Sequence, residues 1–279
     1  MNKIPKPYIV VLGNEKGGTG KSTAAMHIIT SLLKNGFSVA SIDVDARQGT
    51  LTRYVENRRL RQKNTGADLL LPEHRAIFKS ALDHTADAQA EETKTITDTL
   101  VEFKDFDYVV FDTPGSDSFL SRLAHSKADT LITPLNDSFV DLDMLVRVSP
   151  DSLDVLRPST YAEMVWDQKK QKAINGGGSI DWIVMRNRLS NIYSRNKEEM
   201  ERVLKALSKR IGFRLIPGFG ERVIFRELFL SGLTLLDVRE SKAPLSLSHI
   251  AAKQELAVLM EMIQIPQKSF RQSMDRAPV

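Results

Sequence analysis

Residues 13–23 read GNEKGGTGKST, and they directly follow the apolar stretch YIVVL at positions 8–12. From Ser22 onward, apolar residues recur at helical spacing. Glycines at 13, 17, 18 and 20, the last followed by Lys-Ser, lie between a strand and a helix, which is the composition and the place of a phosphate-binding loop, although six residues rather than four separate Gly13 from Gly20. Its glycines let successive backbone N–H groups point at phosphate oxygens, and the start of the helix adds partial positive charge. The stretch therefore predicts a nucleotide site at the end of the first strand.

Two side chains of this loop have specific predicted tasks. We expect the Lys21 amine to bridge the β- and γ-phosphates of a bound nucleotide. The Ser22 hydroxyl is the expected direct ligand of Mg²⁺, because this hard cation prefers oxygen ligands and keeps several waters. The other predicted nucleotide-binding residues of the loop are Gly17, Gly18, Thr19, Gly20 and Thr23.

Further apolar runs follow along the chain, with helical patterns between them. They span residues 39–44, 108–111, 130–135 and 182–185. Because each run is apolar throughout, rather than at alternate positions, each predicts a strand in a sheet covered on both faces. We predict an α/β fold with a doubly wound, mostly parallel sheet flanked by helices, as in P-loop NTPases.

Other segments are less regular. Residues 60–106 fit the alternation poorly and predict surface helices joined by a mobile connection. Residues 168–179, basic and then glycine-rich, predict an exposed loop. Since the chain shows no internal repeat and no long linker, we predict one domain over residues 1–265 and a short frayed tail over residues 266–279.

Composition excludes several classes of protein. The chain has 279 residues, of which 42% are hydrophobic and 27% charged, and its mean hydropathy is −0.23, which indicates a folded globule rather than a disordered chain. The absence of cysteine excludes disulfide scaffolds, thiol catalysis and cysteine-bound iron–sulfur clusters. No signal peptide and no apolar stretch of about 20 residues is present, so we expect a cytoplasmic protein.

Lys16 is a second lysine that a phosphate-binding loop does not require. The stretch KGGTGKS at 16–22 resembles the deviant Walker A motif of the ParA/MinD family of ATPases. The resemblance implies ATP as ligand, with Mg²⁺, and a dimer that sandwiches the nucleotide. In such a homodimer Lys16 would reach the partner's phosphates, in the manner of an arginine finger.

The same resemblance assigns roles to residues at other strand ends. Asp45 would orient the attacking water, and Asp43 would support its loop, although Asp43 can also be a turn or cap residue. Asp112, at the end of YVVFD, would hold Mg²⁺ through water, and Thr113-Pro114-Gly115 would sense the γ-phosphate.

Two further residues of the family's pattern concern the adenine base. Asn187 matches the asparagine that hydrogen-bonds adenine, although an asparagine after a strand is also a common turn former. Pro217 lies where the family's other base-lining segment begins.

Several segments are similar to the MipZ branch of the family, the division-plane-positioning ATPases. They are GNEK at 13–16, TPLNDSFVD at 133–141, FRELF at 225–229 and LTLLD at 233–237. This resemblance implies non-specific binding to double-stranded chromosomal DNA on the nucleoid, a response to a ParB-like partition protein and inhibition of FtsZ assembly. A ParA-type partition ATPase that moves cargo on the nucleoid would carry the same motifs and stays an alternative, as does a nucleotide-holding module without turnover.

Positive charge is concentrated toward the C-terminal third of the chain. Residues 186–226 hold eleven Lys or Arg and four Glu, a local charge of +7 within a chain of net charge +4. Such a surface can bind DNA phosphates without contacting the bases. The alternative is a solvent-exposed helix without a ligand, in which ion pairs between residues four positions apart, such as Glu201–Lys205, are common. The predicted DNA-binding residues are Arg195, Arg202, Lys205, Lys209, Arg222 and Arg226. We expect Arg222 and Arg226 to share one side of a helix whose other side holds Val223, Phe225 and Leu228.

A membrane anchor is the remaining alternative for the C-terminal region. Leu256, Leu259, Met260 and Ile263 form an apolar stripe, as in relatives that end in a bilayer-binding helix. The tail after this stripe contains few apolar residues. We therefore predict that the stripe packs in the core and that the protein has no membrane anchor.

Overall fold

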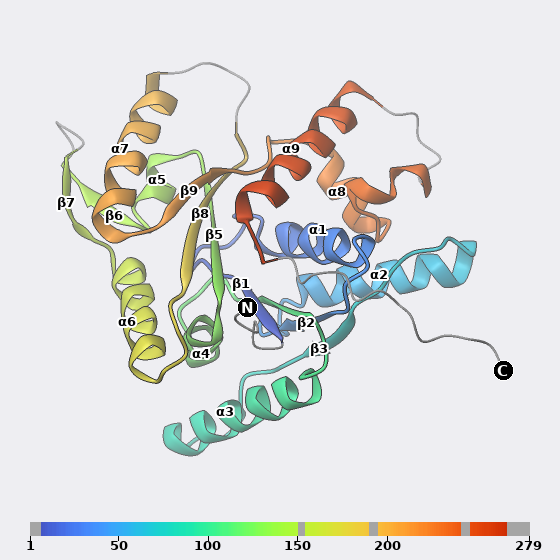
Figure 1. Ribbon diagram of the computed structural model, residues 1–279, viewed down its shortest axis with the longest axis horizontal. Coiled ribbons are helices and arrows are strands. Elements are labelled where there is room, and N and C mark those ends of the chain that lie inside the picture. The colour runs from blue at the N-terminus through green and yellow to red at the C-terminus, as the bar shows by residue number, and fades with distance from the viewer. Residues whose placement is uncertain (1–6, 150–153, 190–194, 241–245, 267–279) are drawn as a thin grey trace.

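The structure is a computed structural model that describes residues 7–149, 154–189, 195–240 and 246–266. Its centre is a seven-stranded sheet in the order β3-β2-β4-β1-β5-β8-β9, with every neighbouring pair parallel (Figure 1). The strands are β1 (Tyr8–Leu12), β2 (Val39–Asp43), β3 (Glu73–Ala76), β4 (Tyr108–Asp112), β5 (Thr130–Asn136), β8 (Asp181–Asn187) and β9 (Arg214–Pro217). The predicted doubly wound α/β fold is confirmed.

Helices cover both faces of this sheet, and each face has its own hydrophobic core (Figure 1). One face carries α1 (Lys21–Lys34), α2 (Thr50–Thr65), α8 (Ile224–Leu230), a 3-10 helix (Leu235–Glu240) and α9 (Leu247–Ile263). The other carries α3 (Thr85–Glu102), α4 (Phe119–Lys127), α5 (Phe139–Leu142), α6 (Thr160–Ile174) and α7 (Arg195–Ile211). A short antiparallel hairpin, β6 (Val146–Val148) and β7 (Val155–Pro158), lies apart from the sheet.

Side chains along each strand alternate between the two cores. In β1, Val10 and Leu12 face the core of α1 and α9, whereas Val11 faces the core of α4 and α7. The apolar stripe of α9 is buried, with Leu256 at 2% exposure and Leu259 at 0%, so the prediction that it packs in the core is confirmed. Among the described residues, no helix combines the length and apolar character needed to cross a membrane.

Residues 60–106 differ from the prediction. The helices are present, but residues 73–76 form β3, which pairs with β2 at the edge of the sheet, so the predicted mobile connection is wrong there. The sequence of β3, EHRA, is polar because an edge strand meets water on one side, and it therefore lacks an apolar signal. Hydrophobic patterning alone could not reveal it.

Two other predictions need correction. The loop predicted at 168–179 is helical up to Ile174, since α6 continues through its lysines, and only the glycine-rich part is a connection. The helix predicted around Arg222 and Arg226 begins later, at Ile224. Of the residues expected on its buried side, Leu228 is buried and Phe225 is partly buried, but Val223 is 65% exposed. The tail predicted over 266–279 lies outside the described residues except for Pro266, whose carbonyl accepts a hydrogen bond from the Tyr108 hydroxyl.

A buried ion pair fastens the segment after α8 to α2. Arg58, 0% exposed, donates two hydrogen bonds to the Asp237 carboxylate, at 2.6 and 3.1 Å. Burial acts to raise the pKa of Asp237, but the bonds and charge of Arg58, with the bonds of Thr234, outweigh it and hold the pKa at about 2. Gly232 lies against the backbone of Arg58, and a β-carbon there would come within 2.2 Å of the Arg58 nitrogen. This contact leaves no room for a side chain.

We therefore expect Gly232→Ala to destabilise the fold much more than Gly66→Ala. Both glycines have positive φ, +65° and +67°, so both alanines carry the same backbone strain of about 1–2 kcal/mol. Only Gly232 also faces a backbone clash, which should add at least about 1–3 kcal/mol. Urea unfolding of both variants measures the difference, and equal losses of unfolding free energy would contradict the tight contact.

Candidate active site

The loop between β1 and α1 lines an open cavity of 610 Å³. Gly18 and Gly20 have φ angles of +74° and +92°, which residues with a side chain rarely adopt. All seven residues from Gly17 to Thr23 line the cavity, and so do Asp45, Thr113, Pro114 and Gly115 from the ends of β2 and β4. The structure thus brings together residues that the sequence analysis selected from three separate stretches.

The segment after β4 packs directly on this loop. A β-carbon on Gly115 would lie 2.7 Å from the backbone nitrogen of Gly17, so only glycine fits. Thr113 is buried, and its hydroxyl donates a hydrogen bond of 2.8 Å to the carbonyl of Leu12. Movement at residues 113–115 therefore acts directly on the backbone of the phosphate loop.

Lys21 and Asp112 are buried titratable groups, one basic and one acidic, beside the cavity. Burial lowers the pKa of Lys21, and the charges of Asp112 and Asp45 oppose that change. Burial raises the pKa of Asp112 to about 8; the charge of Asp43 adds to the rise, and the hydrogen bond from Ser22 opposes it. The Lys21 amine donates to the carbonyl of Lys16 at 3.0 Å. Its charge is therefore held next to the cavity.

The surroundings of Asp112 fit a hydrated divalent cation. Its Oδ1 atom is buried and has no hydrogen-bond partner, while the Ser22 hydroxyl lies beside the same carboxylate. Mg²⁺ binds one or two protein oxygens and keeps several waters, one of which would satisfy the unpaired oxygen. The described residues contain no cluster of three or more His, Cys, Asp or Glu side chains that could hold a metal by themselves.

Asp43 and Asp45 have different surroundings although they are two positions apart. Asp43 is fully buried, and its carboxylate accepts from the Asp45 nitrogen at 2.9 Å and from the hydroxyl and nitrogen of Thr52. It acts as a turn and cap residue that shapes the loop. Asp45 lines the cavity instead, and burial, with the nearby charge of Asp43, raises its pKa. Only Asp45 has a carboxylate available to a water in the cavity.

Lys16 makes an ion pair within its own chain. Its amine contacts the carboxylate of Asp141, which is 3% exposed, while the Lys16 side chain remains 36% exposed. Asp141 lies in α5 and also accepts a hydrogen bond from the Asn136 nitrogen at 3.1 Å. The lysine therefore lies at the surface beside the phosphate cavity, held by a residue 125 positions away.

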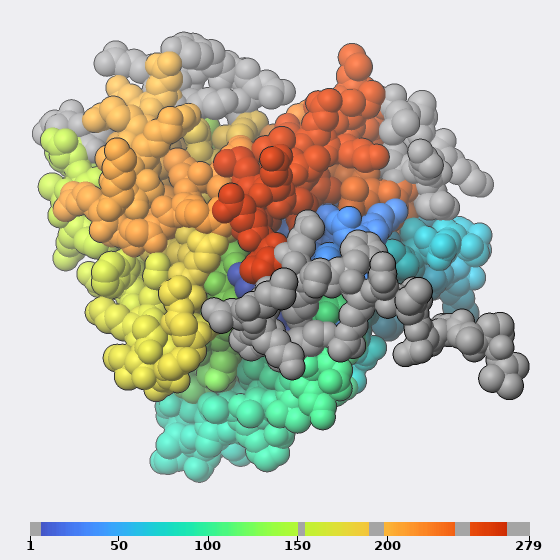
Figure 2. Space-filling view, viewed as in Figure 1, coloured from blue at the N-terminus to red at the C-terminus, as the bar shows by residue number. Residues whose placement is uncertain are grey.

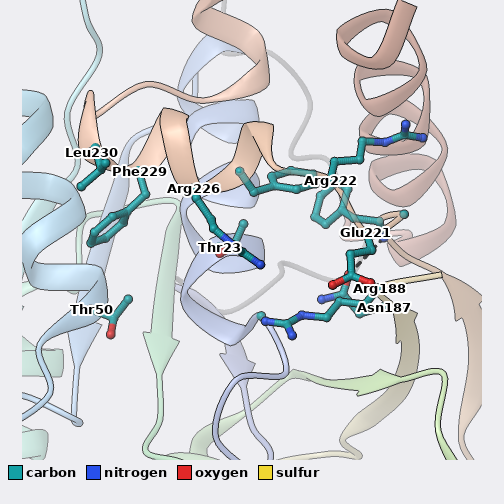
Figure 3. Close-up of a pocket in the computed structure, with 13 residues that line it drawn as sticks. Thr23, Thr50, Asn187, Arg188, Glu221, Arg222, Arg226, Phe229 and Leu230 are labelled. Atoms are coloured by element: carbon teal, nitrogen blue, oxygen red, sulfur yellow. Dashed lines mark hydrogen bonds between the residues drawn. The ribbon is translucent and has the colours of Figure 1, made fainter. Parts of the chain in front are cut away.

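A second cavity, of 340 Å³, adjoins the phosphate cavity, since Gly20, Thr23, Thr50 and Arg188 line both. Figure 3 shows the residues that line it. Asn187 lines it but is also tied to the loop: its amide donates to the carbonyl of Thr19 at 2.7 Å, and its oxygen accepts from the Phe219 nitrogen at 3.2 Å. Pro217 ends β9 without lining either cavity, whereas Phe219, two positions later, lines the second cavity. The cavity's apolar wall of Phe219, Phe225 and Phe229 suits a flat base.

Comparison with known proteins supports this geometry. The family model described as ATPase MipZ matches residues 8–267. The chain belongs to the MipZ ATPase family. One curated relative, the protein virC1 of Rhizobium rhizogenes, is 28% identical over 131 residues. That match covers 46% of this chain and 48% of virC1, so the chain spans about half the length of this relative.

Solved structures of ParA and MinD type share the fold. The ATP complex of a Cyanothece McdA variant has a TM-score of 0.60 at 17% identity, covering 95% of this chain and 99% of that one. A putative plasmid partition protein of Borrelia burgdorferi B31 bound to AMPPNP has a TM-score of 0.56 at 16% identity, covering 92% and 100%. The septum site-determining protein MinD of Pyrococcus horikoshii OT3, with Mg-ADP, has a TM-score of 0.54 at 16% identity, covering 92% and 96%.

The predicted DNA-binding residues of this MipZ-family chain have unequal surroundings. Arg202 and Lys209 lie exposed on α7, and Lys205 is 66% exposed although it pairs with Glu201. The side chain of Arg195 lies outside the described residues. In the space-filling view, α7 (orange) and α9 (red) reach the surface at the same rim of the molecule (Figure 2).

Arg222 and Arg226 do not form one outward-facing pair, so that prediction is wrong. Arg222 precedes α8, and its guanidinium is paired with Glu255 at 2.5 Å. Arg226 lines the 340 Å³ cavity, and Figure 3 shows its side chain directed from α8 toward Thr23. The helix begins two residues later than expected, which turns the two arginines in different directions.

Sequence reasoning missed a polar network behind the phosphate loop. The Tyr161 hydroxyl donates to the carbonyl of Gly13 at 2.8 Å, and Thr133 bonds to the same hydroxyl at 2.9 Å. The imidazole of His125 lies against Gly13, where a β-carbon would come within 2.2 Å of its Nε2 atom. No motif marks Tyr161, Thr133 and His125, because they lie in three different elements, α6, β5 and α4. They join α4, which follows the segment 113–115, to the first residue of the phosphate loop.

We predict that stability falls as pH drops from about 6.5 to about 4. Burial lowers the pKa of His125 to about 4 and that of His27 to about 4, below the 6.5 of an exposed histidine. Between these pH values the unfolded chain binds protons that the folded chain excludes. The free energy of unfolding therefore falls by up to about 1.4 kcal/mol per pH unit for each of these histidines.

Urea unfolding at pH 7.5, 6.0 and 5.0 measures this slope. The His125→Gln variant, which keeps a polar side chain but cannot titrate, should lose the contribution of His125 to this slope. The raised pKa of Asp112 changes stability in the opposite sense over the same window, and does so in both proteins. An identical slope in the variant would show that His125 is not kept neutral by the fold.

Proposed function

We propose that this MipZ-family chain is a slow, magnesium-dependent ATPase that works as a dimerisation switch. The observation that carries the proposal is the place of Lys16, at the surface beside the phosphate cavity and outside the set of residues that cradle the phosphates. Bound ATP joins two copies of the chain, the dimer binds chromosomal DNA without sequence preference, and hydrolysis returns monomers. The protein then acts in the cytoplasm on the nucleoid.

The described residues divide the chemistry among them. Backbone N–H groups of residues 17–23 and the Lys21 amine bind the phosphates. Ser22 directly, and Asp112 through water, would hold Mg²⁺, which supplies neutralisation of charge on the phosphates. Asp45 orients the attacking water, in a loop that Asp43 keeps in shape.

Lys16 supplies the contact between subunits. Its amine leaves Asp141 and reaches the phosphates bound by the partner, where it neutralises negative charge. The exchange leaves the buried Asp141 carboxylate with the hydrogen bond from the Asn136 nitrogen, and the contact of Lys16 with the partner's phosphates must offset the lost ion pair. Since the lysine gains its new ligand only when a triphosphate and a second copy are present, dimerisation depends on ATP.

We expect Lys16→Ala to abolish ATP-dependent dimerisation while leaving monomeric nucleotide binding intact. Light scattering with a non-hydrolysable ATP analogue, compared with ADP, measures the change in mass. Lys104→Ala, at an exposed position away from both cavities, is the matched control and should dimerise normally. Normal dimers of the Lys16 variant would remove the basis of the proposal.

DNA binding is assigned to the exposed positive charges of α7. Arg202 and Lys209 are seven positions apart, about two helical turns, and therefore lie on one side of the helix. Two such surfaces in one dimer double the number of phosphate contacts, and affinity rises steeply with that number. DNA binding would thereby depend on ATP.

The double change of Arg202 and Lys209 to Ala should weaken ATP-dependent DNA retention at least about tenfold at low salt. The slope of log affinity against log salt should fall by about 0.9 for each lost phosphate contact. ATP hydrolysis without DNA should stay unchanged, since neither residue lines a cavity. The Lys104→Ala variant is again the control. If the double variant is retained on DNA as well as the wild type, the charges of α7 do not bind DNA.

The proposed output is inhibition of FtsZ assembly, with position supplied by a ParB-like partition protein. Membership of the MipZ family favours this output over the alternative, a ParA-type ATPase that moves cargo along the nucleoid. Purified protein with ATP should shorten or disperse FtsZ polymers, as followed by sedimentation, and ADP should remove the effect. Intact polymers with either nucleotide would favour the partition function.

A further inference from the structure

Arg188 lies between the two cavities of the site. It is one of the residues that line both the 610 Å³ phosphate cavity and the 340 Å³ cavity beside α1. Figure 3 shows its side chain extending from the Asn187 side across the space below Thr23. A group in this position faces the point where the phosphates of a nucleotide join its nucleoside.

The backbone of Arg188 is held in an unfavourable conformation. Its φ angle is +50°, and among the described residues only Arg188 and Gln264 have positive φ without being glycine. Its neighbours hold it there on both sides. Asn187 is bonded to Thr19 and Phe219, while Leu189 donates to the Phe219 carbonyl at 3.1 Å and accepts from the Glu221 nitrogen at 3.2 Å. Such conformations are concentrated at ligand sites, where the surrounding contacts maintain them.

The guanidinium of Arg188 has no protein partner within the described part of the chain. Its side chain is exposed, and it makes neither a hydrogen bond nor an ion pair there. Nearby arginines are different: Arg186 is paired with Asp137 and Glu201, and Arg222 with Glu255. An arginine aimed into a cavity and left unpaired is available to an anion, and its planar donors match two phosphate oxygens at once.

We propose that Arg188 binds the nucleotide directly, donating hydrogen bonds to the phosphate nearest the ribose. The residue acts in cis, from the same subunit as the phosphate loop, whereas Lys16 acts in trans. It links the phosphate loop to the base-binding segment, because its backbone is fixed to both Thr19 and Phe219 through Asn187. The inference rests on the nucleotide switch proposed above but not on its DNA or FtsZ output.

The test uses binding of a fluorescent ADP, MANT-ADP, to the full chain. Arg188→Asn removes the charge, and asparagine tolerates positive φ, so this variant should fold. We expect its affinity to fall about ten- to hundredfold, the loss typical of a hydrogen bond to a charged group. Arg188→Lys keeps the charge without the planar donors and should lose less. Arg59→Ala, an exposed arginine of α2 outside both cavities, should bind as the wild type does.

Salt separates phosphate binding from stacking on the base. If Arg188 contacts phosphate, the difference in affinity between wild type and Arg188→Asn shrinks as salt rises from about 50 to about 300 mM, because ions screen the attraction. A difference that stays constant with salt would overturn the phosphate assignment in favour of stacking on the base. Equal affinities of the wild type and the variant at low salt would overturn the inference entirely.

The outcome is separable from that of the proposed function. If the wild type binds MANT-ADP and Arg188→Asn does not, but ATP never produces a dimer, the switch fails and the role of Arg188 stands. If ATP-dependent dimers form equally well in both proteins and their ADP affinities agree, the role of Arg188 fails and the switch stands. A wild type that does not bind MANT-ADP would overturn both.

Discussion

The site depends on the parallel register of three neighbouring strands. Leu12 of β1 lies beside Asp112 of β4, and Asp112 lies beside Asp43 of β2. Because parallel strands all end at the same edge, this register places the phosphate loop and both carboxylate-bearing strand ends close to one another. The glycine-to-glycine contact between residues 115 and 17 then closes the arrangement, with no room for a β-carbon. Every proposed step of the chemistry relies on that alignment.

The same alignment buries charge at a cost in free energy. Asp112 has its pKa raised to about 8 by burial and by Asp43, and one of its oxygens lacks a partner. Lys21 has its pKa lowered for the same physical reason. A nucleotide with its metal ion would give the unpaired oxygen of Asp112 a partner and would place phosphate charge beside Lys21, so part of the binding free energy would come from groups that the fold keeps poorly solvated. In this sense the fold prepares the site before any ligand arrives.

Much of the site was predictable because its signals are local in the chain. The phosphate loop lies within eleven consecutive residues, and Asp43, Asp45 and Asp112 each follow an apolar strand that is easy to recognise. Lys16 was conspicuous as an extra charge within that loop. The less accurate predictions concern segments without an apolar pattern, namely β3, whose sequence is polar, and the start of α8, where two residues decide which way the arginines point.

The sequence by itself determined the fold class, the phosphate loop and the strand-end carboxylates, because each follows from the chemistry of a few adjacent residues. Only the tertiary structure decided which groups are engaged with one another. Lys16 meets Asp141, His125 meets Gly13, and Arg188 reaches the cavity beside Thr23, each across more than 100 positions of the chain. Contacts between such distant residues depend on how the helices pack on the sheet, and packing is a property of the whole core rather than of any one stretch.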